Sequence, residues 1–461
     1  MSQHSGQLGT KPILGLFFGM AAPIAVGMMV HGLYNVVDAI FVTRVMGVNA
    51  MGGISIVFPI QMFIFALATL VGSGMASIVA RQLGAKQENA ANTTIDMAFR
   101  FGLVMALALT LGIYFNIDAL LEVLGVSNAL WPYASAYLVP LVLFSFPIVL
   151  ISSVPSDLLR AEGKAVLMMA SMVSSALLNI VLDALFIFVL GMGVEGVAYA
   201  TVLSQIFAIG LMLYFILGGK TQLKLRPFAY AMDWIIVKDI CLLGVPILIS
   251  HAGVSVFIGL TNYSVTQFTT VDSDLYVSAY GLIGRLMIFF ILPAIAMTIA
   301  FQTIAGYNYG AQQYDRVLAM VKLGIFSSLS YGLCVSAIML LVPELIIGIF
   351  AQNSALLTTT ASIAFWSFLL FPLSNAHSLI SSLFQALGKA RQAIFLSSLR
   401  IYIVLIPALL ILPKVYGIDG IWYSFPVADV TAFIVVIYFA LRERGNLIRL
   451  NLKPQPSQPI P

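Results

Sequence analysis

Four polar residues that could bind a cation or carry a proton lie in otherwise apolar stretches of the first half of the sequence. They are Asp38, Asn179, Asp183 and Thr201. If the apolar runs are helices, Asp38 lies about a turn and a half from the end of its helix, and Asp183 and Thr201 lie about two turns from theirs. Asn179 precedes Asp183 by four residues and so shares its helix face. We therefore expect the four groups to meet at one depth.

Two carboxyl groups beside an amide and a hydroxyl suit cation coupling. In a low-dielectric environment such a pair titrates as a unit and is suited to proton uptake. The same oxygen atoms could also hold Na⁺. The alternative is that these groups only make hydrogen bonds between helices. Because Asn or Thr would serve that structural role without a titratable acid, we favour a coupling site for H⁺, with Na⁺ as the other candidate.

The composition indicates which kind of protein scaffold holds these residues in place. Of the 461 residues, 61% are hydrophobic and 9% are charged, whereas soluble domains have about 45–50% apolar and about 25% charged residues. The chain is therefore an integral membrane protein. Two Cys and four His exclude a disulfide framework and make a metal cluster improbable. Without a phosphate loop or a nucleophile motif, we expect no enzymatic activity, no cofactor and no nucleic-acid partner.

Twelve apolar runs are long enough to form membrane-spanning helices of about 20 residues. Each run is uniformly apolar rather than alternating, which excludes spanning strands and predicts an all-α membrane protein. The runs cover residues 13–43, 51–80, 95–115, 131–155, 165–190, 194–218, 234–265, 275–306, 317–342, 361–384, 392–413 and 417–441.

The basic residues predict the orientation of these spans, because Lys and Arg accumulate in cytoplasmic segments. With both termini cytoplasmic, nineteen of the twenty-two Lys and Arg residues lie in or beside cytoplasmic segments. Only Arg44 and Lys414 fall outside, and Arg285 lies within a span. The cytoplasmic residues are Lys11, Arg81, Lys86, Arg100, Arg160, Lys164, Lys220, Lys224, Arg226, Lys238, Arg316, Lys322, Lys389, Arg391, Arg400, Arg442, Arg444, Arg449 and Lys453.

The two halves of the sequence repeat each other. ARQLGAKQ aligns with GYNYGAQQ, LLRAEGKA with LFQALGKA, GVEGVAY with GIDGIWY, and Pro23 with Pro246, at offsets of 226, 225, 224 and 223. Four matches in order at nearly constant spacing indicate a duplicated six-helix unit. We expect two parallel repeats around a central cleft. The segments are an N-lobe (1–218, helices 1–6), an inter-lobe loop (219–233), a C-lobe (234–441, helices 7–12) and a cytoplasmic tail (442–461).

The acids of the first repeat have no counterparts in the second. The positions equivalent to Asp38 and Asp183 lie close to Thr261 and Ala408. Because the second repeat is built without these acids, the fold does not need them. They indicate a functional specialisation of the N-lobe.

The chain resembles the MATE (multidrug and toxic compound extrusion) family over nearly its whole length. The resemblance rests on the duplication, on APIAVGMMVHGLYNVVDAIFV (22–42), and on the loops RQLGAKQ (81–87) and LLRAEGK (158–164). The stretch NIVLD (179–183) and Thr201 are similar to the DinF-like prokaryotic branch. The resemblance implies that Asp38, Asn179, Asp183 and Thr201 form the cation-coupling network of an antiporter.

The resemblance also implies that Pro23 is a helix hinge, since the family places a proline fifteen residues before the Asp of helix 1. A proline removes one backbone hydrogen bond and permits bending. The alternative is a static kink, because membrane helices tolerate proline widely.

The implied function is export of lipophilic, often cationic drugs across the bacterial inner membrane by a monomeric antiporter. Tyr34 and Asn35 lie within a turn of Asp38, and Tyr137 lies in the fourth run. Aromatic faces suit cationic drugs, although ordinary packing explains them equally well. The alternative function is a lipid-linked oligosaccharide flippase. A flippase is expected to bind pyrophosphate through several Arg or Lys residues, whereas the assignment of basic residues above places one Arg, Arg285, within the spans.

Two charged residues of the second half, Arg285 and Asp429, lie within apolar runs. Arg285 is about 15 Å and Asp429 about 18 Å along its helix from the outer end. An unpaired charge at that depth is costly. We therefore predict an ion pair between Arg285 and Asp429 that stabilises the C-lobe.

Overall fold

The computed structural model describes residues 6–225, 228, 231–269, 273–350 and 353–452. All regular secondary structure in these residues is helical. Arg226 and Lys453, two of the basic residues assigned to the cytoplasmic side, lie outside the described residues.

Eleven helical segments are long and apolar enough to cross a membrane, and a bent pair of helices makes a twelfth span. This confirms the predicted all-α membrane fold. In the first half the spans are α2 (Ile13–Met46), α3 (Val48–Gly84), α4 (Glu88–Tyr114), α6 (Trp131–Pro140) continued by η1 (Leu141–Ser145) and α7 (Phe146–Ala161), α8 (Ala165–Ala184) with η2 (Leu185–Val189), and α9 (Val194–Phe215) with η3 (Ile216–Lys220).

The spans of the second half follow the same order. They are α10 (Trp234–Phe268), α11 (Ser273–Gly310), α12 (Tyr314–Leu341), the pair α14 (Ser354–Phe368) and α15 (Phe371–Ala386), α16 (Ala390–Ser398) with η4 (Leu399–Leu405) and α17 (Ile406–Tyr416), and α18 (Ile418–Asn451). Two short helices, α5 (Ile117–Val123) and α13 (Pro343–Ile347), lie between spans, and a third, α1 (Gln7–Thr10), precedes the first span. The last helix is longer than the predicted 417–441, because its amphiphilic end continues the helix to Asn451.

Matching turns end equivalent helices of the two repeats. After α7, Gly163 has a φ of +77°, and the N–H of Lys164 donates to the Leu159 carbonyl at 2.8 Å. After α15, Gly388 has a φ of +78°, and the N–H of Lys389 donates to the carbonyl of Phe384 at 2.8 Å. Glycine reaches this left-handed conformation without steric penalty and closes the helix end. The repeated sequence therefore encodes a repeated turn.

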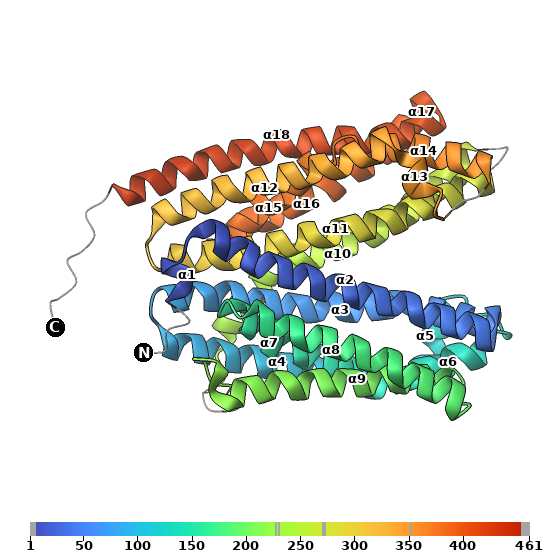
Figure 1. Cartoon of the computed structure of the whole chain (residues 1–461), viewed down its shortest axis with the longest axis horizontal. Coiled ribbons are helices and arrows are strands. Elements are labelled where there is room, and N and C mark those ends of the chain that lie inside the picture. Colours follow the sequence, from blue (N-terminus) through green and yellow to red (C-terminus); the bar gives the residue numbers. More distant parts are fainter. Residues whose placement is uncertain (1–5, 226–227, 229–230, 270–272, 351–352, 453–461) are drawn as a thin grey trace. The chain divides into compact units, whose positions relative to one another are not determined.

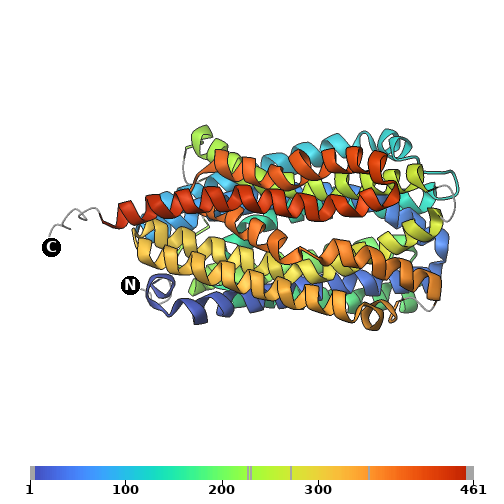
Figure 2. The ribbon, with the colours of Figure 1, turned by 90° about the horizontal axis from the view of Figure 1, so that it is seen from above.

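The helices pack into two compact units, and within each unit the helices run roughly alongside one another (Figures 1 and 2). Unit 1 contains the described residues of 19–82 and 87–248, and unit 2 contains those of 6–18, 83–86 and 249–452. The chain thus passes from one unit to the other inside α2 and inside α10, and the short segment 83–86 at the end of α3 also belongs to unit 2.

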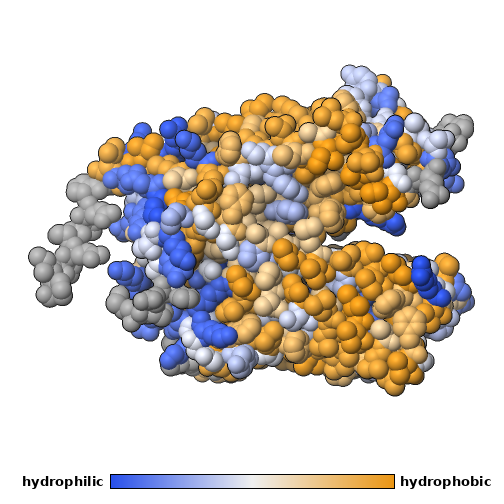
Figure 3. Space-filling model, in the orientation of Figure 1, coloured by the Kyte–Doolittle hydropathy of each residue, from blue (hydrophilic) through white to orange (hydrophobic). Residues whose placement is uncertain are grey.

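Each unit has its own apolar core. Leu138, Leu141 and Leu150 are fully buried in unit 1, and Phe368 and Leu405 are fully buried in unit 2. The outward surface is apolar as well: on the face shown in Figure 3, hydrophobic residues cover the middle of each unit and hydrophilic residues gather toward the helix ends. This distribution fits a protein whose main solvent is lipid.

Candidate functional site

The predicted acidic cluster is assembled in unit 1. Asp38 lies on α2, and Asn179 and Asp183 lie on α8, with Asn179 one turn before Asp183. The amide nitrogen of Asn179, oriented as its neighbouring acceptors require, donates to Asp38 Oδ1 at 3.3 Å and to Asp183 Oδ2 at 3.2 Å. One amide therefore bridges two carboxyl groups from two helices.

The two carboxyl groups also meet each other directly. The carboxyl groups of Asp38 and Asp183 are close enough to interact directly, and a hydrogen bond between them can form only when one of them is protonated, because two carboxylates offer no donor. Asp183 and Asn179 are almost completely buried, and Asp183 Oδ1 has no other hydrogen-bond partner among the described residues. A shared proton would satisfy this oxygen and remove one of two buried negative charges.

The orientation of the Asn179 amide bears on which cation this pair could hold. A sodium ion between the acids would be coordinated by oxygen atoms, but Asn179 presents its nitrogen to both carboxyl groups. Its carbonyl oxygen therefore faces away from the space between them. In this orientation the amide stabilises negative charge by donating hydrogen bonds and supplies no cation ligand.

Two tyrosines and a glutamine extend the polar cluster. Tyr34 and Tyr137 interact electrostatically with both acids and with each other, and Tyr137 is 6% exposed on α6. Gln61 on α3 donates through Nε2 to the Tyr137 hydroxyl at 3.4 Å. Sequence reasoning missed Gln61 because it considered uncharged polar residues mainly near the acids of the other spans, and the run 51–80 contains no acid. A polar, uncharged residue in the middle of the run 51–80 was the available signal.

Asn35 remains near the cluster but faces its own helix. Its amide donates to the carbonyl of His31 at 2.9 Å, and its side chain also bonds to Tyr34. These contacts leave its predicted role toward a substrate untested.

Thr201 lies on α9, which packs against α8, but its hydroxyl bonds within its own helix. Its hydroxyl donates to the carbonyl of Val197 at 3.1 Å. Nearby, Ser175 of α8 donates to the carbonyl of Ser204 on α9 at 2.8 Å, and the side-chain oxygen of Gln205 is buried without a donor among the described residues. The interface between α8 and α9 is therefore more polar than the sequence analysis recognised.

Pro23 lies inside α2, four residues after the chain passes into unit 1 at Gly19. The helix continues through the proline, although the ring cannot donate a backbone hydrogen bond to the Gly19 carbonyl. A hinge at Pro23 stays a prediction.

The predicted ion pair of Arg285 with Asp429 is wrong. The partner of Asp429 is Arg400, whose Nε donates to Asp429 Oδ1 at 2.5 Å. Arg285 is exposed and makes no ion pair in the described part of the chain. Equal depth along two helices did not fix their rotation, which decides which side chains face each other.

Arg400 lies in the interior of a helical span and not at its end. It was assigned to the cytoplasmic boundary, but it lies within the span Ala390–Tyr416, in the π-helical turn η4. Next to it on α15 is His377, 4% exposed, which interacts with Arg400 and bonds to the backbone of Leu396. Unit 2 thus contains a buried charged cluster of its own, on residues that differ from the acids of unit 1.

The chain is similar to known membrane transporters over nearly its whole length. A family model described as MatE matches residues 23–185 and 246–410. The multidrug export protein MepA of Staphylococcus saprophyticus is 23% identical over 444 residues, covering 95% of this chain and 96% of that protein. The probable multidrug resistance protein YoeA of Bacillus subtilis is 24% identical and covers 90% of each chain.

Solved structures agree on the fold. A crystal structure described as MATE in the bent conformation has a TM-score of 0.91 at 23% identity, covering 98% of this chain and 100% of that chain. At this identity the match concerns the fold alone. The relatives are named as exporters and transporters, not as enzymes.

Proposed function

The chain belongs to the MatE family, and on this premise we propose that it is a multidrug efflux antiporter that exchanges lipophilic, often cationic compounds for protons. The observation that carries this proposal is the bridged pair Asp38–Asn179–Asp183 inside unit 1. The relatives named as multidrug exporters support the drug substrates.

Proton uptake at this pair changes the force between two helices. With one proton shared between them, Asp38 on α2 and Asp183 on α8 can be joined by a hydrogen bond. Without it, the buried Asp183 carboxylate and the half-buried Asp38 carboxylate repel each other with less solvent screening than at the surface. Deprotonation therefore favours movement of α2 away from α8, and protonation favours their approach.

The movement of α2 that follows protonation or deprotonation can be converted into a bend at Pro23. Proline lacks the N–H that would bond one turn back, so the helix bends at less cost there than elsewhere. A structural neighbour has been described in a bent conformation. We propose that movement of Asp38 bends α2 at Pro23 and alternates access of the drug site between the two sides of the membrane.

The drug site is proposed to include Tyr34, Asn35 and Tyr137. Tyrosine rings offer apolar surface and a face for cations, and both tyrosines interact with the acids. A cationic drug beside the deprotonated pair gains attraction that protonation removes. This competition between drug and proton for one negative site produces exchange in opposite directions.

We further propose that residues 1–218 and 234–441 form two lobes, and that a monomer lies in the inner membrane with both termini cytoplasmic. A flippase function gains no support from unit 2. Arg400 raises the number of Arg residues within spans, but its guanidinium is already engaged by Asp429.

The test is transport by the purified protein in liposomes under one imposed gradient at a time. We expect ethidium efflux driven by a pH gradient at equal Na⁺ on both sides. A sodium gradient at clamped pH should drive none. Transport by sodium alone would contradict proton coupling, and transport of neither ethidium nor other lipophilic cations under either gradient would contradict drug antiport.

A further inference from the structure

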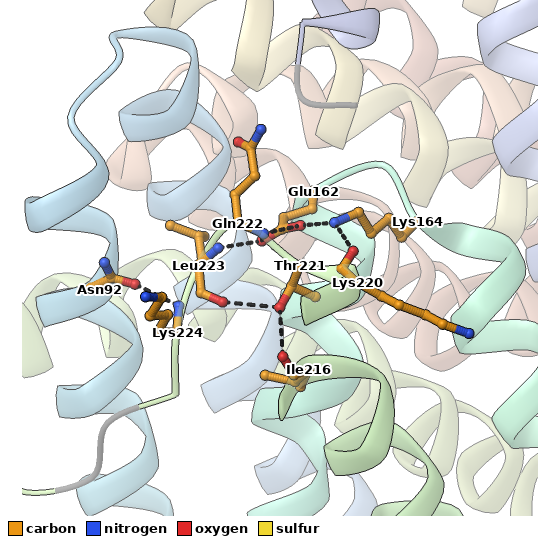
Figure 4. Close-up of polar contacts among 9 residues, drawn as sticks. All are labelled: Asn92, Glu162, Lys164, Ile216, Lys220, Thr221, Gln222, Leu223 and Lys224. Atoms are coloured by element: carbon orange, nitrogen blue, oxygen red, sulfur yellow. Dashed lines mark hydrogen bonds and ion pairs between the residues drawn. The ribbon is translucent and has the colours of Figure 1, made fainter. Parts of the chain in front are cut away.

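The segment that follows η3 lies on the surface of unit 1 as an extended strap. We define the strap as residues 220–225 together with Phe228. Figure 4 shows its polar contacts with Glu162 at the end of α7 and with Asn92 on α4. Leu223 is the strap's fully buried side chain. The segment joins the two halves of the sequence, so its attachment decides where that connection is flexible.

Glu162 is the first anchor of the strap. Its carboxylate is 2% exposed and accepts the backbone N–H of Leu223 at 2.8 Å and that of Gln222 at 3.0 Å. The Lys164 ammonium bonds both to this carboxylate and to the backbone carbonyl of Lys220. A buried carboxylate is tolerated only when it is well satisfied, and here the strap supplies the donors.

The second anchor is one face of α4. Asn92, Asp96 and Arg100 follow each other at intervals of four residues and so share this face. Asn92 Oδ1 accepts the backbone N–H of Lys224 at 2.9 Å, and Asp96 Oδ1 accepts that of Phe228 at 2.7 Å. The Arg100 guanidinium pairs with Asp96 at 2.7 Å and lies 5.0 Å above the Phe228 ring.

These contacts recognise the main chain of the strap. The backbone N–H groups of Gln222, Leu223, Lys224 and Phe228 all donate to these side chains. Hydrogen bonds to a charged acceptor are stronger than bonds between neutral groups. The anchors should therefore tolerate changes of exposed strap side chains but not the loss of their own acceptor groups.

The duplicated sequence offers a natural comparison for Glu162. In the aligned turns LLRAEGKA and LFQALGKA, Glu162 corresponds to Leu387. The lysine is kept in both repeats, but Lys389 pairs at 2.5 Å with Glu443 on α18. The turn itself thus folds with leucine at this position. The glutamate occurs in the repeat that is followed by a strap.

We propose that the groove of unit 1 lined by Asn92, Asp96 and Glu162 is a docking site for the strap backbone, which makes the strap and the first part of α10 a rigid extension of unit 1. The flexible connection between the halves then lies within α10 and not in the loop. Two features support this. Unit 1 continues as far as Leu248, and Pro246 interrupts the helical hydrogen bonds just before that point.

Hydrogen–deuterium exchange in lipid nanodiscs tests the docking. The wild-type amides of Gln222 and Leu223 should be protected, and Glu162→Leu should accelerate their exchange by about tenfold or more. Glu162→Gln keeps one acceptor oxygen and should give an intermediate effect. Lys224→Ala is the matched control, since its side chain is exposed and its amide remains, and should leave protection unchanged.

Two exchange results would overturn the proposal. One is wild-type protection in Glu162→Leu, and the other is an equal loss of protection in Lys224→Ala. Unchanged exchange in α8 and α9 shows that a variant has folded. The measurement needs no transport, so its outcome is independent of the proposed drug export.

A distance measurement tests the rigid attachment. Spin labels are placed at Lys224→Cys on the strap and Val123→Cys, 84% exposed in unit 1, in a protein whose Cys241 and Cys334 are replaced by Ser. We expect one narrow distance distribution that stays the same with and without a pH gradient, and a broad one after Glu162→Leu. A broad distribution with Glu162 intact would show that the strap is a free tether.

Discussion

The ion pair between Arg400 and Asp429 allows a quantitative test of what stabilises unit 2. The pair links η4 to α18 at 2.5 Å, and the carboxyl side is 2% exposed while the guanidinium side chain is 20% exposed. We consider Arg400→Met, Asp429→Leu and the double variant. Arg285→Met is the control, because Arg285 is exposed and unpaired in the described residues.

The two single variants should lower the free energy of unfolding by different amounts, because Asp429 is more deeply buried than Arg400. Arg400→Met leaves the buried Asp429 carboxyl alone, which costs about 3–5 kcal/mol for buried pairs in soluble proteins and about 3 kcal/mol for an acid at the bilayer centre. Since the Asp429 carboxyl can take up a proton and lose its charge, we expect Arg400→Met to lower the free energy of unfolding by about 3 kcal/mol, the lower end of this range. Asp429→Leu leaves Arg400, whose longer side chain is less buried than the carboxyl group and can extend away from the site, so we expect a smaller loss of about 1–2 kcal/mol.

The double variant separates pairing from packing. With both charges removed, no unpaired group remains, and the loss should be smaller than the sum of the single losses by about 2 kcal/mol. The assay is the free energy of unfolding in mild detergent titrated with a denaturing detergent. Arg285→Met should change it by less than about 0.5 kcal/mol. Additive single losses, or an Arg285→Met loss equal to that of Arg400→Met, would refute the pairing described here.

Three other variants test the site in unit 1. Pro23→Ala should slow ethidium efflux several-fold while ethidium affinity, measured by fluorescence anisotropy, stays near wild type; unchanged turnover would reduce Pro23 to a static kink. Tyr137→Phe removes the hydroxyl beside the acids and should lower efflux by about tenfold, equal to about 1.4 kcal/mol, with a shifted pH profile. Gln61→Leu should have a smaller effect of the same kind, and almost none in the Tyr137→Phe background, whereas additive losses in the efflux assay would show that Gln61 does not act through Tyr137.

The main features of the fold could be predicted because each is encoded locally. Uniformly apolar runs gave the spans, and the repeated turns around Gly163 and Gly388 adopt the same backbone conformation. The bend of 41° between α14 and α15 could not be located from apolarity alone. It coincides with Pro372 in the first turn of α15, where the preceding residues leave the helical conformation.

The two charged clusters show which part of a site a sequence determines. Asp38 and Asp183 come together as expected, since Asn179 lies on the same face as Asp183 and bridges to α2. The pairing of Asp429 failed because depth along a helix says nothing about its rotation. Arg400 was overlooked because basic residues near span ends are ordinarily cytoplasmic, and the π-helical turn η4 changes which side chains face inward.

Simultaneous recording of drug efflux and internal pH in proteoliposomes tests proton coupling at the acidic pair most directly. We expect wild-type protein to move protons into the vesicle interior as ethidium leaves. Asp38→Asn and Asp183→Asn should lose both fluxes while unfolding at nearly the wild-type temperature. Coupled proton and drug fluxes in either folded variant would contradict the assignment of Asp38 and Asp183 as the coupling site.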